Sequence, residues 1–272
     1  MLYDRSYYIE QSVPIEPELK SLFSLKAPLI IFDIGACEGE ETIKYARIFP
    51  NSSIYAFEPL PANQELIRDN FAKYGVKNAV AIQKALSFST GITTFYVSSG
   101  KPENAIPADW DFGNKSSSLL PPAKHLQAAS FIHFDEKIEV ETITLNSFCS
   151  QNNITKIDFI HMDVQGAELM VLEGAGNFIN SIKAIWLEVS RITLYKNQPL
   201  VNDIAEFMKR KNFILLKDDC GTIQGDQLYV SCNFFSKGKI TRIKNWIAAR
   251  SLLKRFLRKV NLTALPLFNR KS

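Results

Sequence analysis

Short apolar runs and segments of helical periodicity alternate along the first third of the chain. Runs rich in Ile, Phe, Val and Ala span 28–35, 53–58 and 79–85. Apolar residues at helical spacing follow the first two runs, at 40–49 and 61–74. A strand followed by a helix and then by another strand is the repeating unit of a parallel sheet, so these segments predict the first half of such a sheet.

The same alternation continues in the second half of the chain. Patterns of buried strands at 156–162 and 183–189 are separated by a predicted helix at 167–175, and another helix is predicted at 201–211. Further strand patterns lie at 93–97, 137–143, 213–216 and 227–235. This order predicts a doubly wound α/β domain, in which a mostly parallel sheet carries helices on both faces.

Length and composition indicate one catalytic domain with an addition at each end. The 272 residues are 46% hydrophobic and 11% aromatic, which suffices for a packed core, and no long Gly- or Ser-rich linker divides them. We predict an N-terminal helical segment at 1–28, a catalytic domain at 29–235 and a C-terminal tail at 236–272. The stretch 98–135 is rich in Pro, Ser and Asn, and we predict that it forms a lid or substrate-binding insert.

The C-terminal tail differs from the rest of the chain in charge. The formal net charge of the chain is +4, yet residues 236–272 contain eleven Lys or Arg and no Asp or Glu. Apolar residues recur there at helical spacing: Ile240, Ile243, Trp246, Ile247, Leu253, Leu257 and Val260. A basic amphipathic helix over 239–260 suits an anionic membrane surface, or docks on the domain or on a second copy. Basic residues also attract nucleic acid, but no base-reading motif accompanies them, so we expect no specific nucleic-acid partner.

Cysteine use and hydropathy favour a cytoplasmic protein. The four cysteines form no C-x-x-C pair, and the first residues lack the basic-then-apolar pattern of a secretory signal. No run reaches the roughly 18 apolar residues that a membrane-spanning helix needs. We therefore expect a reducing, cytoplasmic location, with peripheral attachment to the inner face of the membrane if the tail binds lipid.

The turn after the first predicted strand carries a carboxylate and two glycines, in the sequence Asp33-Ile34-Gly35-Ala36-Cys37-Glu38-Gly39. Glycine lets the backbone turn tightly and approach a ligand closely. The spacing differs from the G-x-G-x-x-G that seats a dinucleotide pyrophosphate, which argues against a nicotinamide-dependent oxidoreductase. Glu58 closes the second predicted strand, where an acidic side chain can accept the ribose hydroxyls of a nucleoside cofactor.

Three motifs in order resemble the FkbM-type methyltransferases. They are Asp33 to Gly39 as above, Phe57-Glu58-Pro59, and Asp163-Val164-Gln165-Gly166-Ala167-Glu168 followed by Val171-Leu172-Glu173-Gly174-Ala175. The resemblance covers residues 29–235 and implies a Rossmann-like class I methyltransferase fold with a mostly parallel seven-stranded sheet. Cys37 departs from the family pattern, which usually has Asn there, and we interpret it as a packing residue.

The resemblance implies S-adenosylmethionine as the cofactor. Its sulfonium and amino groups are cationic and it carries no phosphate, so acidic residues around the first turn suit it. The residues expected to bind it are Asp33, Gly35, Ala36, Cys37, Gly39, Glu58, Pro59, Ala85 and Asp163.

The resemblance also implies methylation of a hydroxyl on a sugar, glycan or glycolipid, or on a polyketide-like natural product. The acceptor oxygen must be aligned with the methyl carbon and must lose its proton to a base. Asp163 ends a strand that is expected to adjoin the first one, so we predict it as the catalytic residue, with His161 and Glu188 as further candidates. A catalytic metal is not expected; if Mg²⁺ takes part, Asp163 and Glu188 would supply its oxygen ligands.

Several residues and functions are weaker candidates. His161 also suits a hydrogen bond within the sheet, and Glu168 suits the first turn of a helix. The loop 116–119 resembles a serine-containing segment of the family, and His125 and His133 are candidate bases in the insert. N-methylation of a small molecule or protein is an alternative, although no N-P-P-Y-like run follows the fourth strand. A non-catalytic Rossmann-like module with a membrane-binding tail is another, and the intact cofactor motifs argue against it.

Overall fold

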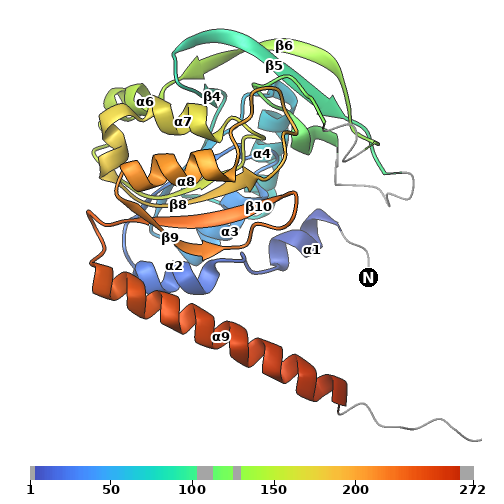
Figure 1. The fold of residues 1–272 in the computed structure, drawn as a ribbon. Coiled ribbons are helices and arrows are strands. Elements are labelled where there is room, and N and C mark those ends of the chain that lie inside the picture. Colours follow the sequence, from blue (N-terminus) through green and yellow to red (C-terminus); the bar gives the residue numbers. More distant parts are fainter. Residues whose placement is uncertain (1–3, 103–112, 125–129, 264–272) are drawn as a thin grey trace, which may run out of the picture.

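A seven-stranded sheet with strand order β3-β2-β1-β7-β8-β10-β9 lies at the centre of the computed structural model, which describes residues 4–102, 113–124 and 130–263 (Figure 1). The strands are β1 (Ile30–Ile34), β2 (Ser53–Phe57), β3 (Ala79–Ile82), β7 (Ile157–Met162), β8 (Ile182–Ser190), β9 (Phe213–Asp218) and β10 (Gln224–Ser231). Neighbouring strands from β3 to β8 are parallel, whereas β10 is antiparallel to both β8 and β9. The predicted mostly parallel α/β fold is confirmed, with one strand reversed.

Helices cover both faces of this sheet because successive strand residues point to opposite sides. Phe32 and Ile34 pack in one apolar cluster with α6, α7 and α8, while Ile31 packs in the opposite cluster with α2, α3 and the start of α9. The remaining helices, α1 and α4, pack beside α3. The helices are α1 (Arg5–Glu10), α2 (Glu16–Leu22), α3 (Glu40–Ile48), α4 (Pro61–Lys73), α6 (Leu145–Gln151), α7 (Glu168–Gly174), α8 (Val201–Arg210) and α9 (Lys237–Thr263).

A second, three-stranded sheet of order β4-β6-β5 lies above one edge of the domain (Figure 1). It contains β4 (Ala85–Leu86), β5 (Gly91–Ser99) and β6 (His133–Ile143), with β5 and β6 antiparallel. The single strand expected over 79–85 is therefore wrong: β3 ends in the main sheet at Ile82, and β4 begins the second sheet. Between them the amide of Lys84 donates to the Ile82 carbonyl at 2.9 Å, which turns the chain out of the first sheet.

The predicted insert 98–135 is held at both ends by this second sheet, because β5 reaches Ser99 and β6 begins at His133. A short 3-10 helix, η1 (Gly113–Ser116), lies between the two strands and contacts β5. The Ser98 hydroxyl donates to the carbonyl of Gly113, and the Ser98 amide donates to Ser117 Oγ at 3.0 Å. These bonds fix η1 relative to the strand and so position the residues that η1 presents to the main domain.

The tail begins as a helix docked on the main domain. Ile240 and Ile243 are buried and Ile247 is half-buried, all in the apolar cluster that contains Leu19 of α2 and Leu216 of β9. The helix then continues past α2 and away from the body of the domain (Figure 1). In the part of the chain that the structure describes, no helix is both long and apolar enough to cross a bilayer.

Candidate active site

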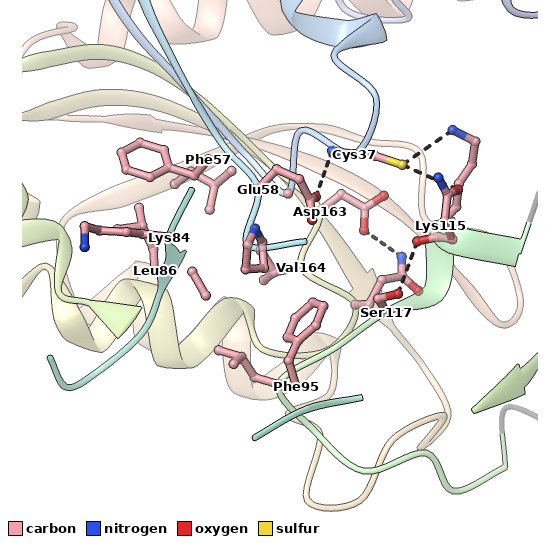
Figure 2. Close-up of a pocket in the computed structure, with 17 residues that line it drawn as sticks. Cys37, Phe57, Glu58, Lys84, Leu86, Phe95, Lys115, Ser117, Asp163 and Val164 are labelled. Atoms are coloured by element: carbon pink, nitrogen blue, oxygen red, sulfur yellow. Dashed lines mark hydrogen bonds between the residues drawn. The ribbon is translucent and has the colours of Figure 1, made fainter. Parts of the chain in front are cut away.

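Most of the predicted site residues lie at the carboxyl ends of β1, β2 and β7, which are adjacent in the sheet. This is where ligands of open parallel sheets bind. A pocket there is shown in Figure 2, and its lining residues are Ile34, Gly35, Cys37, Phe57, Glu58, Pro59, Lys84, Ala85, Leu86, Phe95, Asn114, Lys115, Ser117, Leu119, Asp163, Val164 and Gln165. Six of the nine residues predicted to bind the cofactor therefore line this pocket; Asp33, Ala36 and Gly39 do not.

The turn after β1 fits tightly against the turn after β7. Gly35 has φ +85°, and a β-carbon at this position would lie 1.8 Å from the carbonyl oxygen of Asp163. Gly39 has φ +84° and begins α3, where a β-carbon would press on the ring of Phe71 at 3.0 Å. Only glycine combines these φ values with so little space, which explains the two glycines of the motif.

Cys37 also has a positive φ, of +51°, in the region that Asn adopts more readily than most residues. Its thiol faces Asn63, Asn114 and Lys115, with the Lys115 Nζ at 3.6 Å from Sγ. Burial raises the pKa of the Cys37 thiol well above its usual range. A thiol held neutral by burial is a poor nucleophile, which agrees with its interpretation as a packing residue.

Glu58 stands at the end of β2 with its carboxylate facing the pocket, where it is 5% exposed. One carboxylate oxygen accepts the amide of Cys37 at 3.1 Å, and the other accepts the amide of Leu60 at 2.9 Å. Burial raises the pKa of Glu58 to about 7, although both backbone bonds oppose this shift. The Asn63 side chain also hydrogen-bonds this carboxylate, so about one of its four lone pairs is left for a ligand hydroxyl.

Asp33 and His161 form a buried pair on the floor of the site. Asp33 Oδ1 lies 2.8 Å from His161 Nδ1, and Asp33 Oδ2 accepts the hydroxyl of Thr42. Burial alone would lower the pKa of His161, but the hydrogen bond and charge of Asp33 raise it to about 9. The imidazole is therefore protonated near neutral pH, so the structure favours His161 as a partner that orients Asp33 over His161 as a proton acceptor.

A second hollow continues from the first on the side of α1 and α3. It shares Gly35, Cys37, Lys115 and Asp163 with the first pocket, and it adds Tyr8, Asp33, Ala36, Glu40, Glu41 and His161. The Tyr8 hydroxyl donates to Glu41 at 2.5 Å, and Lys44 pairs with the same carboxylate at 3.0 Å. The two hollows together form an elongated site, lined by apolar groups at one end and by carboxylates at the other.

Lys115 of η1 reaches the junction of the two hollows, and its role was not predicted. Its ammonium group lies 3.0 Å from Glu40 Oε1. Burial by itself would lower the pKa of Lys115. The opposite effect of Cys37, Glu40 and Glu38 is larger, so the pKa is raised overall. A permanently charged cation thus stands at the centre of an otherwise acidic site. No local sequence pattern marks this lysine, because η1 is brought to the cleft by the second sheet.

Three carboxylates gather beside the cleft, and of these only Asp163 lines the two hollows, whereas Glu168 and the predicted catalytic residue Glu188 line neither. Ligand atoms of Asp163, Glu168 and Glu188 lie within 4.8 Å of one another, and this trio is the group in the described part of the chain that could hold a divalent cation beside the cleft. Gln165 Nε2 bridges Asp163 Oδ1 at 2.6 Å and Glu188 Oε2 at 3.1 Å. Glu168 was not among the predicted metal ligands; its Oε1 accepts the amides of Val164 and Gly166, both at 3.2 Å.

The carboxylates of this trio have raised pKa values. Burial is the main cause for each of them. The pKa of Glu168 rises to about 7, and that of Glu188 rises well above its usual range because Asp163 and Glu168 add like charge. The pKa of Asp163 rises too, although the Gln165 amide and the charge of His161 counteract the shift. A buried carboxylate that favours its proton is suited to accepting one from a bound hydroxyl.

Some of the remaining predicted residues line the two hollows and others do not. Ala36, Pro59 and Ala85 line the site, as do Ser117 and Leu119 of the predicted serine-containing loop. His133 is exposed at the start of β6 and lines neither hollow, and His125 lies outside the described residues. Phe95 of β5 and Gln165 also line the pocket; sequence analysis did not assign them because neither belongs to a residue type that by itself indicates chemistry.

Comparison with known proteins gives one family. The family described as "Methyltransferase FkbM domain" matches residues 33–215. The 2-O-methyltransferase NoeI of Sinorhizobium fredii is 29% identical over 217 residues, which are 80% of this chain and 85% of NoeI. Methyltransferase 1 of Beauveria bassiana is 29% identical over 187 residues, which cover 63% of this chain and 72% of that protein. Among solved structures, M. capricolum TrmK with S-adenosyl-homocysteine superposes with a TM-score of 0.42 at 12% identity, covering 94% of this chain and 89% of that one.

Proposed function

Because this chain belongs to the FkbM methyltransferase family, we propose that it transfers a methyl group from S-adenosylmethionine to a hydroxyl of a sugar, glycan or glycolipid. The observation that carries this proposal is the elongated site, in which an apolar slot with Glu58 continues into a hollow lined by several carboxylates, with Lys115 where the two meet and His161 paired with Asp33 on its floor. The cofactor has the same order of parts: an apolar base, a ribose and a charged amino acid.

The nucleoside would occupy the apolar end. Phe57, Leu86 and Phe95 offer a slot for the flat adenine ring, and Glu58 stands beside them at the end of β2. Both Glu58 oxygens already accept a backbone amide, which fixes the carboxylate. The lone pair that these amides and the Asn63 side chain leave would accept a ribose hydroxyl, an arrangement that needs no phosphate-binding loop.

The amino-acid end of the cofactor would lie over the turn between Gly35 and Gly39. Asp33, Glu40 and Asp163 line this hollow and complement the positive sulfonium and amino groups. The cofactor also carries a carboxylate, for which Lys115 is the cation shared by both hollows. Because this hollow offers both carboxylates and an ammonium group, it favours a zwitterionic amino acid over a neutral or purely anionic ligand.

The acceptor hydroxyl would approach from the rim. Asp163 is shared by both hollows and adjoins Glu188 through Gln165, so its carboxylate would accept the proton of a hydroxyl aligned with the methyl group. Its raised pKa makes it a stronger base than an exposed aspartate. The relative NoeI is named a 2-O-methyltransferase, which supports oxygen as the acceptor atom.

A transfer assay tests this proposal. The purified full chain would be incubated with methyl-labelled S-adenosylmethionine and a panel of free sugars, oligosaccharides and glycolipids, and the label would be followed into each acceptor. Label on a hydroxyl oxygen, identified by mass spectrometry, is the expected result. Transfer to nitrogen only, or binding of the cofactor with no transfer to any hydroxyl acceptor, would contradict the acceptor class.

A further inference from the structure

The apolar residues of α9 fall into two sets on different sides of the helix. Ile240, Ile243 and Ile247 face the domain and are buried or half-buried. Leu252 follows Ile247 by five residues, which places it about 140° around a helix of 3.6 residues per turn. It is 66% exposed. Leu252 was not part of the predicted apolar stripe, and the structure shows that it lies on a different side from the docked isoleucines.

The second set continues in the sequence along the part of α9 that leaves the domain. The helix backbone extends to Thr263. At 100° per residue, the sequence places Phe256 about 40°, Val260 about 80° and Leu253 about 100° around the helix from Leu252, and Leu257 follows at the edge of this apolar sector. Trp246, which is 38% exposed, lies next to this side, and the Arg250 guanidinium stacks on its ring at 4.7 Å. Of this apolar sector, the side chains that the structure describes, Trp246 and Leu252, are both exposed.

Basic residues occupy the other side of the same segment. Arg250, Lys254, Arg255, Arg258 and Lys259 lie within ten positions, and residues 236–272 contain no Asp or Glu. A second copy of this helix would bring the same positive charges together, which opposes self-association through this side. An anionic lipid surface instead takes up the apolar side, while Lys and Arg at its edges reach the phosphates.

We propose that the segment 246–260 of α9 binds an anionic membrane surface. The later part of α9 runs away from the body of the domain, so the domain would stand clear of the lipid (Figure 1). The docked start of α9, anchored by Ile240 and Ile243, would transmit this attachment to the catalytic domain as a rigid helix. The proposal does not depend on which acceptor the enzyme methylates.

Vesicle sedimentation of the full chain tests this proposal with two matched variants. L252D with F256D places two carboxylates on the apolar side, whereas S251D with N261D places two elsewhere on the same helix and changes the net charge equally. The wild type and the second variant should sediment with vesicles of phosphatidylglycerol and phosphatidylcholine. The first variant should bind these vesicles at least about tenfold more weakly, because burial of two large apolar side chains is lost.

Three outcomes would overturn the proposal. The first is failure of the wild type to sediment with anionic vesicles at low salt. The second is equal loss of binding in both variants, which would show attraction by charge alone. The third is a dimer in sedimentation velocity that L252D with F256D abolishes, without lipid binding, since a second copy would then cover the helix. Circular dichroism and methyl transfer to a soluble acceptor verify that both variants are folded.

Discussion

The backbone of Gly35 lies so close to that of Asp163 that a β-carbon at position 35 would stand 1.8 Å from the Asp163 carbonyl oxygen. This contact joins the turn that holds the cofactor to the residue proposed as the base. The two turns come from β1 and β7, neighbours in the sheet although about 130 residues apart in the sequence. The turn proposed to bind the cofactor and the carboxylate proposed as the base are therefore packed as one unit.

Replacement of Gly35 should disrupt this unit. G35A forces the turn away from Asp163 and also strains a residue at φ +85°, so we expect a loss of roughly 3 kcal/mol or more in stability and of measurable S-adenosylhomocysteine binding. Urea unfolding and calorimetric titration measure the two effects. G75A is the matched control, because Gly75 has φ +67° but no atom within 4 Å of the added carbon. Similar losses in both variants would contradict the importance of the contact.

If Asp163 is the base, its replacement should lower turnover far more than it lowers cofactor binding. D163N keeps the size of the side chain but cannot accept the proton, so kcat should fall by about 10²–10⁴-fold. S-adenosylhomocysteine affinity should fall by far less than kcat, because D163N removes one of the carboxylates that face the amino group while Glu58, the apolar slot and Lys115 remain. Methyl-transfer kinetics at saturating cofactor provide the measurement. Turnover within a few-fold of the wild type would remove Asp163 from the mechanism.

Glu168 should make the domain less stable as the pH rises. Its pKa is raised by burial to about 7, so between its ordinary pKa and about 7 the folded state binds more protons than the unfolded state. Stability therefore falls as the pH rises through this window, on the order of 1–3 kcal/mol for this group, and levels off above it. The neutral E168Q can still accept the Val164 and Gly166 amides, and it should gain stability relative to the wild type at pH 8 but not at pH 5.

Urea unfolding at the two pH values tests this expectation. E173Q is the control, because Glu173 lies on the same helix but is exposed, and its substitution should leave the pH dependence of the wild type unchanged. An equal stability difference between E168Q and the wild type at both pH values would show that Glu168 is ionised throughout.

The charge of Lys115 should strengthen the binding of ligands that carry the amino-acid part of the cofactor. K115M should weaken S-adenosylhomocysteine binding by about tenfold or more, since a charge-assisted contact with the ligand carboxylate is lost. Binding of 5′-methylthioadenosine, which lacks the amino acid, should not change. K115R keeps the charge and should retain part of the affinity. Equal weakening for both ligands would mean that Lys115 only supports the loop through Glu40.

Local patterns were sufficient to predict the parts of the site that lie on consecutive strand ends. Asp33, Glu58 and Asp163 each follow an apolar run, and parallel strands bring their carboxyl ends to one edge. Lys115 and Phe95 could not be found this way, because they reach the cleft through the second sheet, whose pairing joins residues about 40 apart. The exposure of apolar side chains on α9 was also hidden, since periodicity shows which residues are apolar but not which side the domain covers.

The central claim is that the site binds S-adenosylmethionine, and calorimetric titration of the full chain with this cofactor beside NAD tests it most directly. We predict micromolar binding of S-adenosylmethionine, no binding of NAD, and a loss of at least about tenfold in affinity for E58A, because the proposed hydrogen bond from the ribose to a buried carboxylate disappears. Binding of NAD instead, no binding of either molecule by the folded chain, or undiminished affinity in E58A would contradict the account.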